Sequence, residues 1–470
     1  LIALTDHDTM SGVEECFKKG LELDLSVIAG VEMSCVYKEK EIHILGYLLP
    51  SSISERELNI PKAKSELEVY NYLTKLASKN ASSSEYTTFL GAGAYDHYIP
   101  AVIPTIISRS EFLTSYTPYQ PEISQGTLQY IFEFQTMISN LTGMEYANAS
   151  LYDQGTSLAE AAIMTAHHAK KKKVLVSEAI APWSREVLKT YLHAQHIEME
   201  VVKTCNGVTC IDDLKAKLND EVGAVLVQNP NFFGNIEDVT KVSELAHGFK
   251  KCYSVVSVDP SSLGTLKKPS DCNVDVVVGE AQSLGIPISY GGPYLGFMAV
   301  NKEFLRKIPG RIVGQTVDRD GKRCWVLTLS AREQHIKRDK ATSNICSNQG
   351  INVLTAAIYM DLLGKEGLKE LSKQCIKKSH YLYKKLLETG KFEKVKSLEK
   401  VFDAPFYKEF ALKAKKPICE LNKKLFENGI IGGFDLGKYY PELENVIMFA
   451  VTEKRTKEEI DKLCKVLEEA

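Results

Sequence analysis

The stretch CYSVVSVDPSSLGTLKKPSDCNVDVVVGEAQSLGIPISYGGPYLGFMAV, residues 252–300, decides the fold. Its β-branched apolar runs predict short buried strands, and the first run ends on Asp259. The second run leads into Gln282 and the glycine-rich turn YGGP. No lysine stands between the second run and that turn, and the nearest ones, Lys267 and Lys268, belong to the polar loop GTLKKPSD. An acid at a strand end is therefore present without a reactive amine after it.

The same alternation of short apolar strands and amphipathic helices continues on both sides of this stretch. KVLVS, IEMEVV and VGAVLVQNP predict strands, while SLAEAAIMTAHHAKK and IEDVTKVSELAHGF predict helices. We therefore expect an α/β fold with a mainly parallel sheet covered by helices on both faces. Long helices and two or three strands follow and predict a smaller α+β domain. The predicted divisions are 1–52, 53–120, 121–335 and 336–470.

Composition excludes several classes of function. The 58 Lys and Arg against 60 Asp and Glu give a net charge of -2, so no basic field would hold nucleic acid or an anionic membrane. The 11 cysteines form no CxxC pair, which favours reduced thiols and a cytoplasmic location. No apolar run reaches the roughly 18 residues that span a bilayer. The chain begins at Leu1 inside a predicted strand, so we expect that it is cut at its start.

The first stretch carries a separate set of candidate ligands. A β-α-β-β pattern places Asp6, His7, Glu32 and His43 at strand ends, and carboxylates with imidazoles suit a hydrolytic metal site. Through LTDHDT, GVEMS and EIHILGY this segment resembles the PHP (polymerase and histidinol phosphatase) metallohydrolase domain. The resemblance implies further ligands that do not follow here. We expect an inactive remnant, with metallohydrolase activity as the alternative.

Longer motifs carry a second resemblance, from about residue 53 to the end. They are AYDHYIPAVI, YTPYQPEISQGTLQYIFEFQTMISNLTGMEYANASLYDQGTSLAEA, GEAQSLGIPISYGGPYLGFMAV, GRIVGQTVD and REQHIKRDKATSNICSNQG. The chain resembles the N-terminal or alpha type of subunit (subunit 1) of glycine dehydrogenase (decarboxylating), the P-protein of the glycine cleavage system. This implies a pyridoxal phosphate (PLP) fold of type I. In that family only the other, homologous half carries the PLP lysine.

Matching the family's glycine-rich turn to PISYGGP puts Gln282 at the lysine position. A carboxamide forms no Schiff base, so we expect no covalent PLP in this chain. Asp259 is interpreted either as a vestigial partner of the cofactor ring or as a structural strand-end acid. Thr156 opens a helix, where it could cradle a phosphate, although a helix cap formed by Thr156 or Ser157 explains the same residues. HHAKKKK, residues 167–173, is interpreted as a solvated helix end.

Three polar, ring-rich clusters keep a functional interpretation. They are YDHYIP, YTPYQPE and KATSNICSNQ, and the resemblance assigns them to the rim of the partner subunit's site through Tyr95, Tyr98, Tyr116, Tyr119, Gln120 and Asn344. Loops of this composition face a ligand or a partner. The alternative is that they only order the interface between the subunits.

The resemblance also implies the reaction and the partners. Subunit 2 would hold PLP, which serves as an electron sink for loss of CO2 from glycine, and the aminomethyl group would pass to the lipoyl arm of the H-protein. Two copies of each subunit would form a heterotetramer, and this chain would shape the path of the lipoyl arm. A self-sufficient PLP enzyme that uses another lysine is a further alternative.

Overall fold

The computed structural model describes residues 2–7, 27–37, 40–47, 65–341, 343–396 and 402–470, the first three ranges by their backbone alone. The chain divides into two compact units, Leu1–Glu85 and Tyr86–Ala470. Each unit is described by itself below. The domain boundaries expected from the sequence stay predictions.

The first unit contains a three-stranded sheet and one helix. β1 (Ile2–His7) pairs in parallel with β2 (Val27–Tyr37), which pairs antiparallel with β3 (Lys40–Tyr47). The three predicted strands are thus confirmed, while the helix expected between the first two falls outside the described residues. Helix α2 (Glu66–Ala77) begins at a capping box in which Ser65 and Glu68 bond each other's backbone amides.

The predicted metal ligands lie on these three strands, but only Asp6 and His7 lie at a strand end, as predicted; Glu32 and His43 lie within β2 and β3. The register sets His7 beside Glu32, and it sets His43 beside Ser34. Their side chains, like that of Asp6, lie outside the described part of the chain. The metal site therefore stays a prediction.

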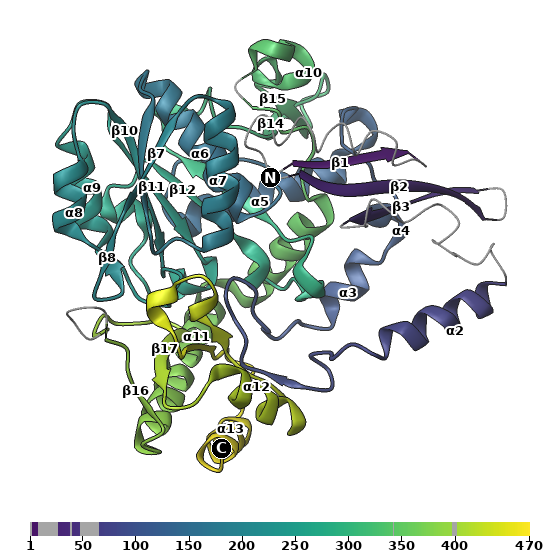
Figure 1. The fold of residues 1–470 in the computed structure, drawn as a ribbon. Helices are drawn as coiled ribbons and strands as arrows, with labels where there is room; N and C mark the ends of the chain where they lie inside the picture. The colour runs from purple at the N-terminus through teal and green to yellow at the C-terminus, as the bar shows by residue number, and fades with distance from the viewer. Residues whose placement is uncertain (1, 8–26, 38–39, 48–64, 342, 397–401) are drawn as a thin grey trace. The chain divides into compact units, whose positions relative to one another are not determined.

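The second unit is built on a seven-stranded sheet with the order β5-β13-β12-β11-β10-β6-β7 (Figure 1). Strands β12, β11, β10, β6 and β7 are parallel, and β13 and β5 add an antiparallel edge. This confirms the mainly parallel sheet. The bounds are β5 Tyr146–Ala147, β6 Lys173–Ser177, β7 Glu198–Val202, β10 Val222–Asn229, β11 Tyr253–Val258, β12 Val276–Glu280 and β13 Gly296–Val300.

Both faces of the sheet are buried, which explains why its strands are continuous apolar runs. In β10, Val225 and Val227 pack into one core, whereas Ala224 and Leu226 pack into the other. The first core is completed by helices α5, α8, α9 and α11, and the second by α6 and α7. These helices are α5 Gln125–Thr142, α6 Gln154–Ala169, α7 Pro182–Ala194, α8 Ile211–Lys217, α9 Val239–His247 and α11 Gly350–Glu388.

The chain then forms the smaller domain predicted from the sequence. Its antiparallel sheet has the order β16-β17-β20-β19, and its core lies between that sheet and the helices α11, α12 and α13. A parallel pair of β18 with β4 joins residues 87–88 to this domain. The bounds are β4 Thr87–Thr88, β16 Phe392–Lys394, β17 Glu409–Ala414, α12 Ile418–Glu427, β18 Ile430–Ile431, β19 Phe434–Asp435, β20 Val446–Ala450 and α13 Lys457–Glu468.

Shorter elements connect these parts. Helices α3 and α4 and a 3-10 turn precede α5, and the β14–β15 hairpin and α10 lie between β13 and α11. Their bounds are α3 Val102–Ile107, α4 Ser110–Leu113, β8 Thr204–Cys205, β9 Val208–Thr209, β14 Ile312–Val317, β15 Arg323–Thr328 and α10 Gln334–Lys337.

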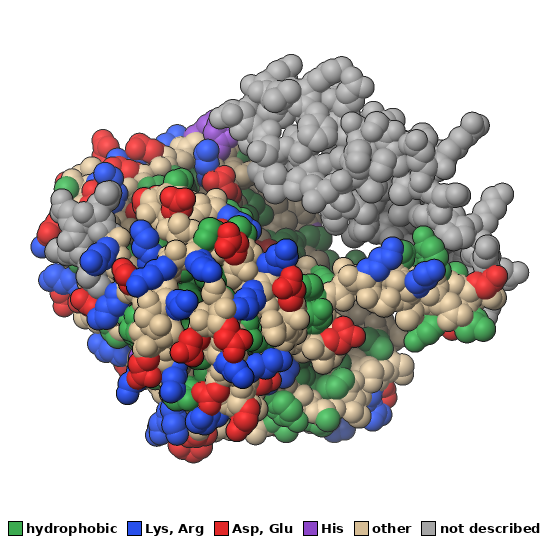
Figure 2. Space-filling model, turned by 60° about the horizontal axis from the view of Figure 1, so that its bottom comes forward, with side chains coloured by type: hydrophobic (Ala, Val, Ile, Leu, Met, Phe, Trp, Pro, Cys, Tyr) green, Lys and Arg blue, Asp and Glu red, His purple; other side chains and the backbone are tan. Residues whose placement is uncertain are grey.

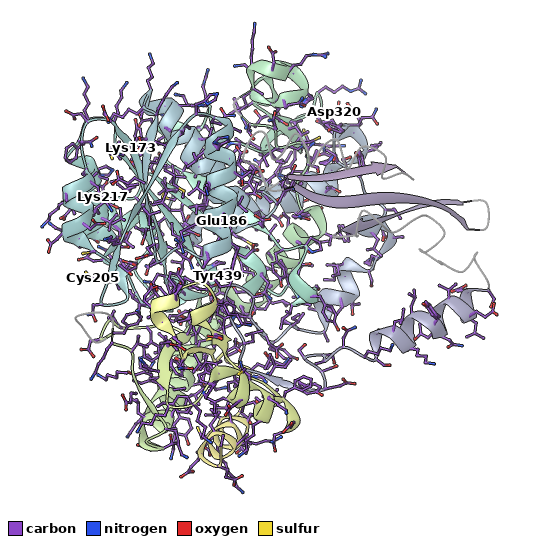
Figure 3. All side chains as sticks on the ribbon, viewed as in Figure 1. Lys173, Glu186, Cys205, Lys217, Asp320 and Tyr439 are labelled. Atoms are coloured by element: carbon purple, nitrogen blue, oxygen red, sulfur yellow. The ribbon has the colours of Figure 1, made fainter. Side chains whose placement is uncertain are left out.

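An aromatic cluster fixes the small domain against the large one. Trp183 of α7 meets Phe232 edge-on with ring centroids 5.1 Å apart, and Tyr439 of the small domain meets Trp183 at 6.0 Å. Figure 3 labels Tyr439 at this junction. Such ring pairs add to the stabilisation that comes from buried area. The two domains of this unit therefore hold one defined arrangement.

The face of the small domain carries mixed charge. Figure 2 shows Lys and Arg interspersed with Asp and Glu rather than gathered by sign, as the net charge of -2 suggests. Within the described residues, no helix combines the length and the apolar character that crossing a membrane requires.

Candidate cofactor pocket

A pocket lies where the parallel strands β10, β11 and β12 end. Gln228, Asp259 and Glu280 line it from these strand ends, and Gln154 lines it from the start of α6. Ligands of open α/β sheets bind at this edge. Tyr95 and Lys408 complete the lining from segments that are distant in sequence.

The carboxylate of Asp259 is bonded by other residues of this chain. Its carboxylate accepts hydrogen bonds from the Ser261 amide at 3.0 Å and the Ser283 hydroxyl at 2.6 Å. It also forms an ion pair with the ammonium of Lys408 at 2.5 Å. Burial opposes ionisation of Asp259, but the charge of Lys408 together with the hydrogen bonds from Lys408 and Ser283 outweighs it and keeps the pKa of this carboxyl below its usual value. The strand-end acid therefore already has its cation.

Lys408 stands immediately before β17, and its side chain is only 2% exposed. The ammonium lies 3.4 Å from the centre of the Tyr95 ring, a close cation–π contact. It also donates to Nε2 of His97 at 3.0 Å. A lysine from the small domain thus occupies the space above Asp259.

The polar chain continues through His97. An ammonium has only donors, so Nε2 of His97 accepts from Lys408, and the ring proton sits on Nδ1. Nδ1 donates to Glu453 at 2.6 Å, and the Tyr98 amide donates to the same carboxylate at 2.8 Å. Burial would raise the pKa of Glu453, but the contact with His97 and these hydrogen bonds hold it at about 2. The contacts form one continuous network that runs from Asp259 through the buried Lys408 and His97 to Glu453.

Gln282 is 1% exposed and acts as a clamp on the segment around Tyr95. Its carbonyl accepts from the Tyr95 amide at 2.8 Å. Its amide group donates to the carbonyls of Tyr95 at 3.0 Å and Ile286 at 2.7 Å. Both amide hydrogens and the oxygen are therefore in use within the protein.

Tyr95 is fixed at its other end by Glu409. The hydroxyl donates to that carboxylate at 2.7 Å, and the Ala92 amide donates to its second oxygen at 2.7 Å. Burial raises the pKa of both Tyr95 and Glu409. Of the residues assigned to the partner's rim, Tyr95 thus faces the interior of its own chain.

The start of α6 is closed by carboxylates. Asp153 caps the helix by accepting from the Thr156 amide at 2.7 Å, and Glu280 accepts from the Gln154 amide at 3.1 Å. The expected cap by Thr156 or Ser157 is wrong, because Asp153 precedes both and reaches the amide three residues on. Burial raises the pKa of Glu280 to about 8. The amides of Gln154, Thr156 and Ser157, which could cradle a phosphate, are therefore already bonded.

These residues do not fit PLP. The space left in the pocket is about 30 Å³, room for about one water molecule. Asp259 pairs with Lys408, and Gln282, at the lysine position, bonds Tyr95 and Ile286. The start of α6 is bonded by Asp153 and Glu280. The two lysines nearest in sequence are exposed and bonded elsewhere: Lys267 donates to Thr240 and Lys268 donates to the Asn140 carbonyl.

The other predicted rim residues lie on the surface. Tyr116 is 85% exposed, and Tyr98, Tyr119, Gln120 and Asn344 are exposed as well. The sequence analysis missed Lys408, His97 and Glu453 as members of the pocket network. His97 is part of YDHYIP and Glu453 is part of VTEKR, but no local sequence pattern indicates that the two side chains contact each other.

The comparisons with known proteins agree with this picture. A family model described as glycine cleavage system P-protein matches residues 40–467. A probable glycine dehydrogenase (decarboxylating) subunit 1 of Anoxybacillus flavithermus is 53% identical over 420 residues, 89% of this chain and 92% of the relative. One of Listeria monocytogenes is 52% identical over 440 residues, 93% of this chain and 96% of the relative.

Solved structures match most of this chain. A crystal structure of glycine decarboxylase (P-protein) in inhibitor-bound form gives a TM-score of 0.82 at 40% identity, covering 90% of this chain and 93% of that one. A sphingosine-1-phosphate lyase of Burkholderia pseudomallei gives 0.64 at 12% identity over 87% and 91%, which shows a shared fold alone. The fold is thus that of the type I PLP enzymes, and the chain belongs to the glycine cleavage system P-protein family.

Proposed function

We propose that this chain is the subunit of glycine dehydrogenase (decarboxylating) that holds no PLP, and that a lysine-bearing subunit 2 holds it. The observation that carries the proposal is the ion pair of Lys408 with Asp259 inside the pocket. Gln282 at the lysine position and the carboxylates at the start of α6 support it. The homologues are named subunit 1, which implies a second subunit.

The reaction belongs to the complex. Glycine loses CO2, and its aminomethyl group passes to the lipoyl arm of the H-protein. PLP on subunit 2 supplies the electron sink for this chemistry. The residues of this chain then have to position the partner's substrates and exclude water, because none of the pocket residues described above is free to react.

The exposed aromatic residues are suited to that task. Tyr119 is held by Arg311, which donates to its hydroxyl at 3.0 Å and lies 5.2 Å from the ring centre. Tyr98 is anchored through its amide to Glu453 while its ring is 61% exposed. Rigid, exposed rings of this kind are enriched in protein interfaces. We assign them, with Tyr116, Gln120 and Asn344, to the rim of the partner's site.

The segment around Tyr116 and Tyr119 also supports a large interface. Leu113 and Ile123 flank the tyrosines and are 59% and 81% exposed. Apolar side chains this exposed favour a partner. We expect a heterotetramer with two copies of each subunit, in which each pair buries more than about 2,000 Å². The buried cysteines Cys252, Cys272, Cys375 and Cys464 are free thiols, which supports a reducing compartment such as the cytoplasm.

Exchange of labelled CO2 with the carboxyl group of glycine tests the proposal. This chain, subunit 2 and their mixture are each assayed with PLP and lipoylated H-protein. We expect exchange from the mixture and none from this chain alone. Exchange by this chain alone, or a mixture no more active than subunit 2, would refute the proposal.

A further inference from the structure

A second cavity lies at the far end of α6 from the cofactor pocket. It has a volume of about 300 Å³ and is lined by His167 and His168 of α6, Arg306, Lys307, Arg332 and Lys337. The helix rises about 1.5 Å per residue, so its two ends are roughly 20 Å apart. The cavity is therefore separate from the site described above. Its size matches the smaller ligand pockets of proteins.

The charge of the cavity is positive. Four of its residues carry a permanent charge, and no acidic residue is among those described as lining it. The acid closest in sequence to Arg332 is Glu333, whose carboxylate lies 3.7 Å from His335 and forms no ion pair with Arg332 among the described contacts. None of the four cations forms an ion pair among the described contacts, although the charge of Glu333 acts on Arg332 and that of Glu303 acts on Lys307.

Lys307 forms no ion pair among the described contacts, although its charge acts on the nearby Glu303. Its ammonium donates to Nδ1 of His168, so this imidazole carries its proton on Nε2. Nε2 donates to Glu303 at 2.6 Å, and Tyr253 donates to the same carboxylate at 3.0 Å. Glu303 is therefore satisfied by two neutral donors. The ammonium of Lys307 therefore bonds His168 rather than this carboxylate, and it lines the cavity.

Arg332 gives the most specific indication of a ligand. Its Nη1 donates to the carbonyl of Ile308. Its Nε and Nη2 are shielded from solvent and have no hydrogen-bond partner. Buried donors without acceptors cost free energy, and here burial also lowers the pKa of the guanidinium. Nε and Nη2 form one edge of the guanidinium, the edge that binds two oxygens of a carboxylate or phosphate side by side.

A simpler explanation covers only part of this cluster. Cations are favourable near a helix C-terminus, which accounts for His167 and His168 in the last turn of α6. It does not account for Arg332, which comes from a different segment and has two buried donors with no carbonyl to bond. The sequence-based interpretation of residues 167–173 as a solvated face is also incomplete, since both histidines line the cavity.

We propose that this cavity binds a phosphate group, with two of its oxygens on the Nε and Nη2 edge of Arg332 and a third near Lys307. Arg306 and Lys337, which are exposed, guide the anion in and close around it. The volume exceeds that of phosphate itself, so the group is either inorganic phosphate or the phosphoryl end of a small phosphorylated metabolite. The proposal does not depend on the glycine reaction.

Isothermal titration calorimetry of the full chain at constant ionic strength tests the proposal. The probes are inorganic phosphate and glycerol 3-phosphate, with sodium chloride adjusted to balance each addition. We expect saturable binding of at least one probe. Arg332→Met should weaken it at least about tenfold, and Arg306→Met about threefold. Lys241→Met is the matched control, because that lysine is exposed and pairs with Glu244 on α9. It should leave the affinity unchanged.

The comparison of probes decides the source of the phosphate. Tighter binding of glycerol 3-phosphate assigns the cavity to a phosphorylated metabolite, and tighter binding of inorganic phosphate assigns it to the free ion. Circular dichroism checks that each variant is folded. If Arg332→Met fails to fold, Arg306→Met and Lys337→Met decide, since both side chains are exposed. Absence of binding below about 10 mM, or equal binding by pocket and control variants, would overturn the proposal.

Discussion

The ammonium of Lys408 lies 2.5 Å from the carboxylate of Asp259, although the two residues belong to different domains of the fold. Asp259 directly follows the central strand β11, and Lys408 directly precedes β17 of the small domain. The pair therefore closes the pocket from both sides. It ties the small domain to the large one at the place where type I PLP enzymes keep their cofactor.

Removal of the lysine charge is expected to destabilise the chain strongly. Lys408→Met leaves Asp259 buried without its cation, which costs about 3–5 kcal/mol of the free energy of unfolding. Urea denaturation followed by circular dichroism measures this loss. Lys241→Met, in an exposed pair with Glu244, should cost less than about 0.5 kcal/mol.

The double variant Lys408→Met, Asp259→Asn separates charge from packing. Because it removes both charges, it should recover part of the stability lost in the single variant. A double variant that is less stable than the sum of the two single losses would contradict the role of the ion pair.

Stability should fall in acid because of Glu453. Its pKa in the folded chain, about 2, is below the ordinary value of 4.5. The ionised form is therefore favoured by folding, so the stabilisation is complete above about pH 4.5 and is lost as the pH falls toward 2. The size is roughly 3 kcal/mol. Glu453→Gln should be less stable at pH 7 and should lose this part of the pH dependence. If the free energies of unfolding of the variant and the parent change in parallel between pH 2 and 5, Glu453 does not make this contribution.

The sequence was sufficient for the framework of the pocket. Continuous apolar runs predict β10 and β11 as strands buried on both faces, and Asp259 follows from its place at a strand end. Lys408 could not be predicted in the same way. In FYKEFALKA it resembles an ordinary solvent-facing lysine of an edge strand, and only the packing of the small domain buries it.

The contacts among the side chains that fill the pocket could also not be predicted from local sequence patterns. The side chain of Gln282 bonds the backbone amide and carbonyl of Tyr95 across a long sequence separation. The helix cap was misassigned because Thr156 and Ser157 are both good capping residues, whereas the choice of Asp153 depends on where α6 begins.

Changes at the exposed tyrosines should slow the complex without removing its PLP. Tyr116→Ala and Tyr119→Ala are expected to lower glycine-dependent CO2 exchange at saturating subunit 2 by about tenfold, because each removes a rigid ring from the rim. Tyr70→Ala, at an exposed position on α2, is the control. If the rate recovers fully at high subunit 2 concentration, these residues only order the interface.

Gln282→Lys should not restore a cofactor site. The new amine replaces three hydrogen bonds that clamp Tyr95 and Ile286, so we expect a loss of about 1–3 kcal/mol in the free energy of unfolding. Lys408 still fills the space above Asp259, so PLP absorbance should not appear on this variant. Gln374→Lys, at a half-buried position of α11 where the side chain bonds only Glu370 among the described contacts, should change neither quantity.

Reduction with borohydride tests the central claim most directly. The complex of this chain with subunit 2 is saturated with PLP, reduced, digested and analysed by mass spectrometry, which locates every lysine that held the cofactor. We predict a modified lysine in subunit 2 and none in this chain. Modification of Lys408, Lys267 or Lys268 in this chain would contradict the account.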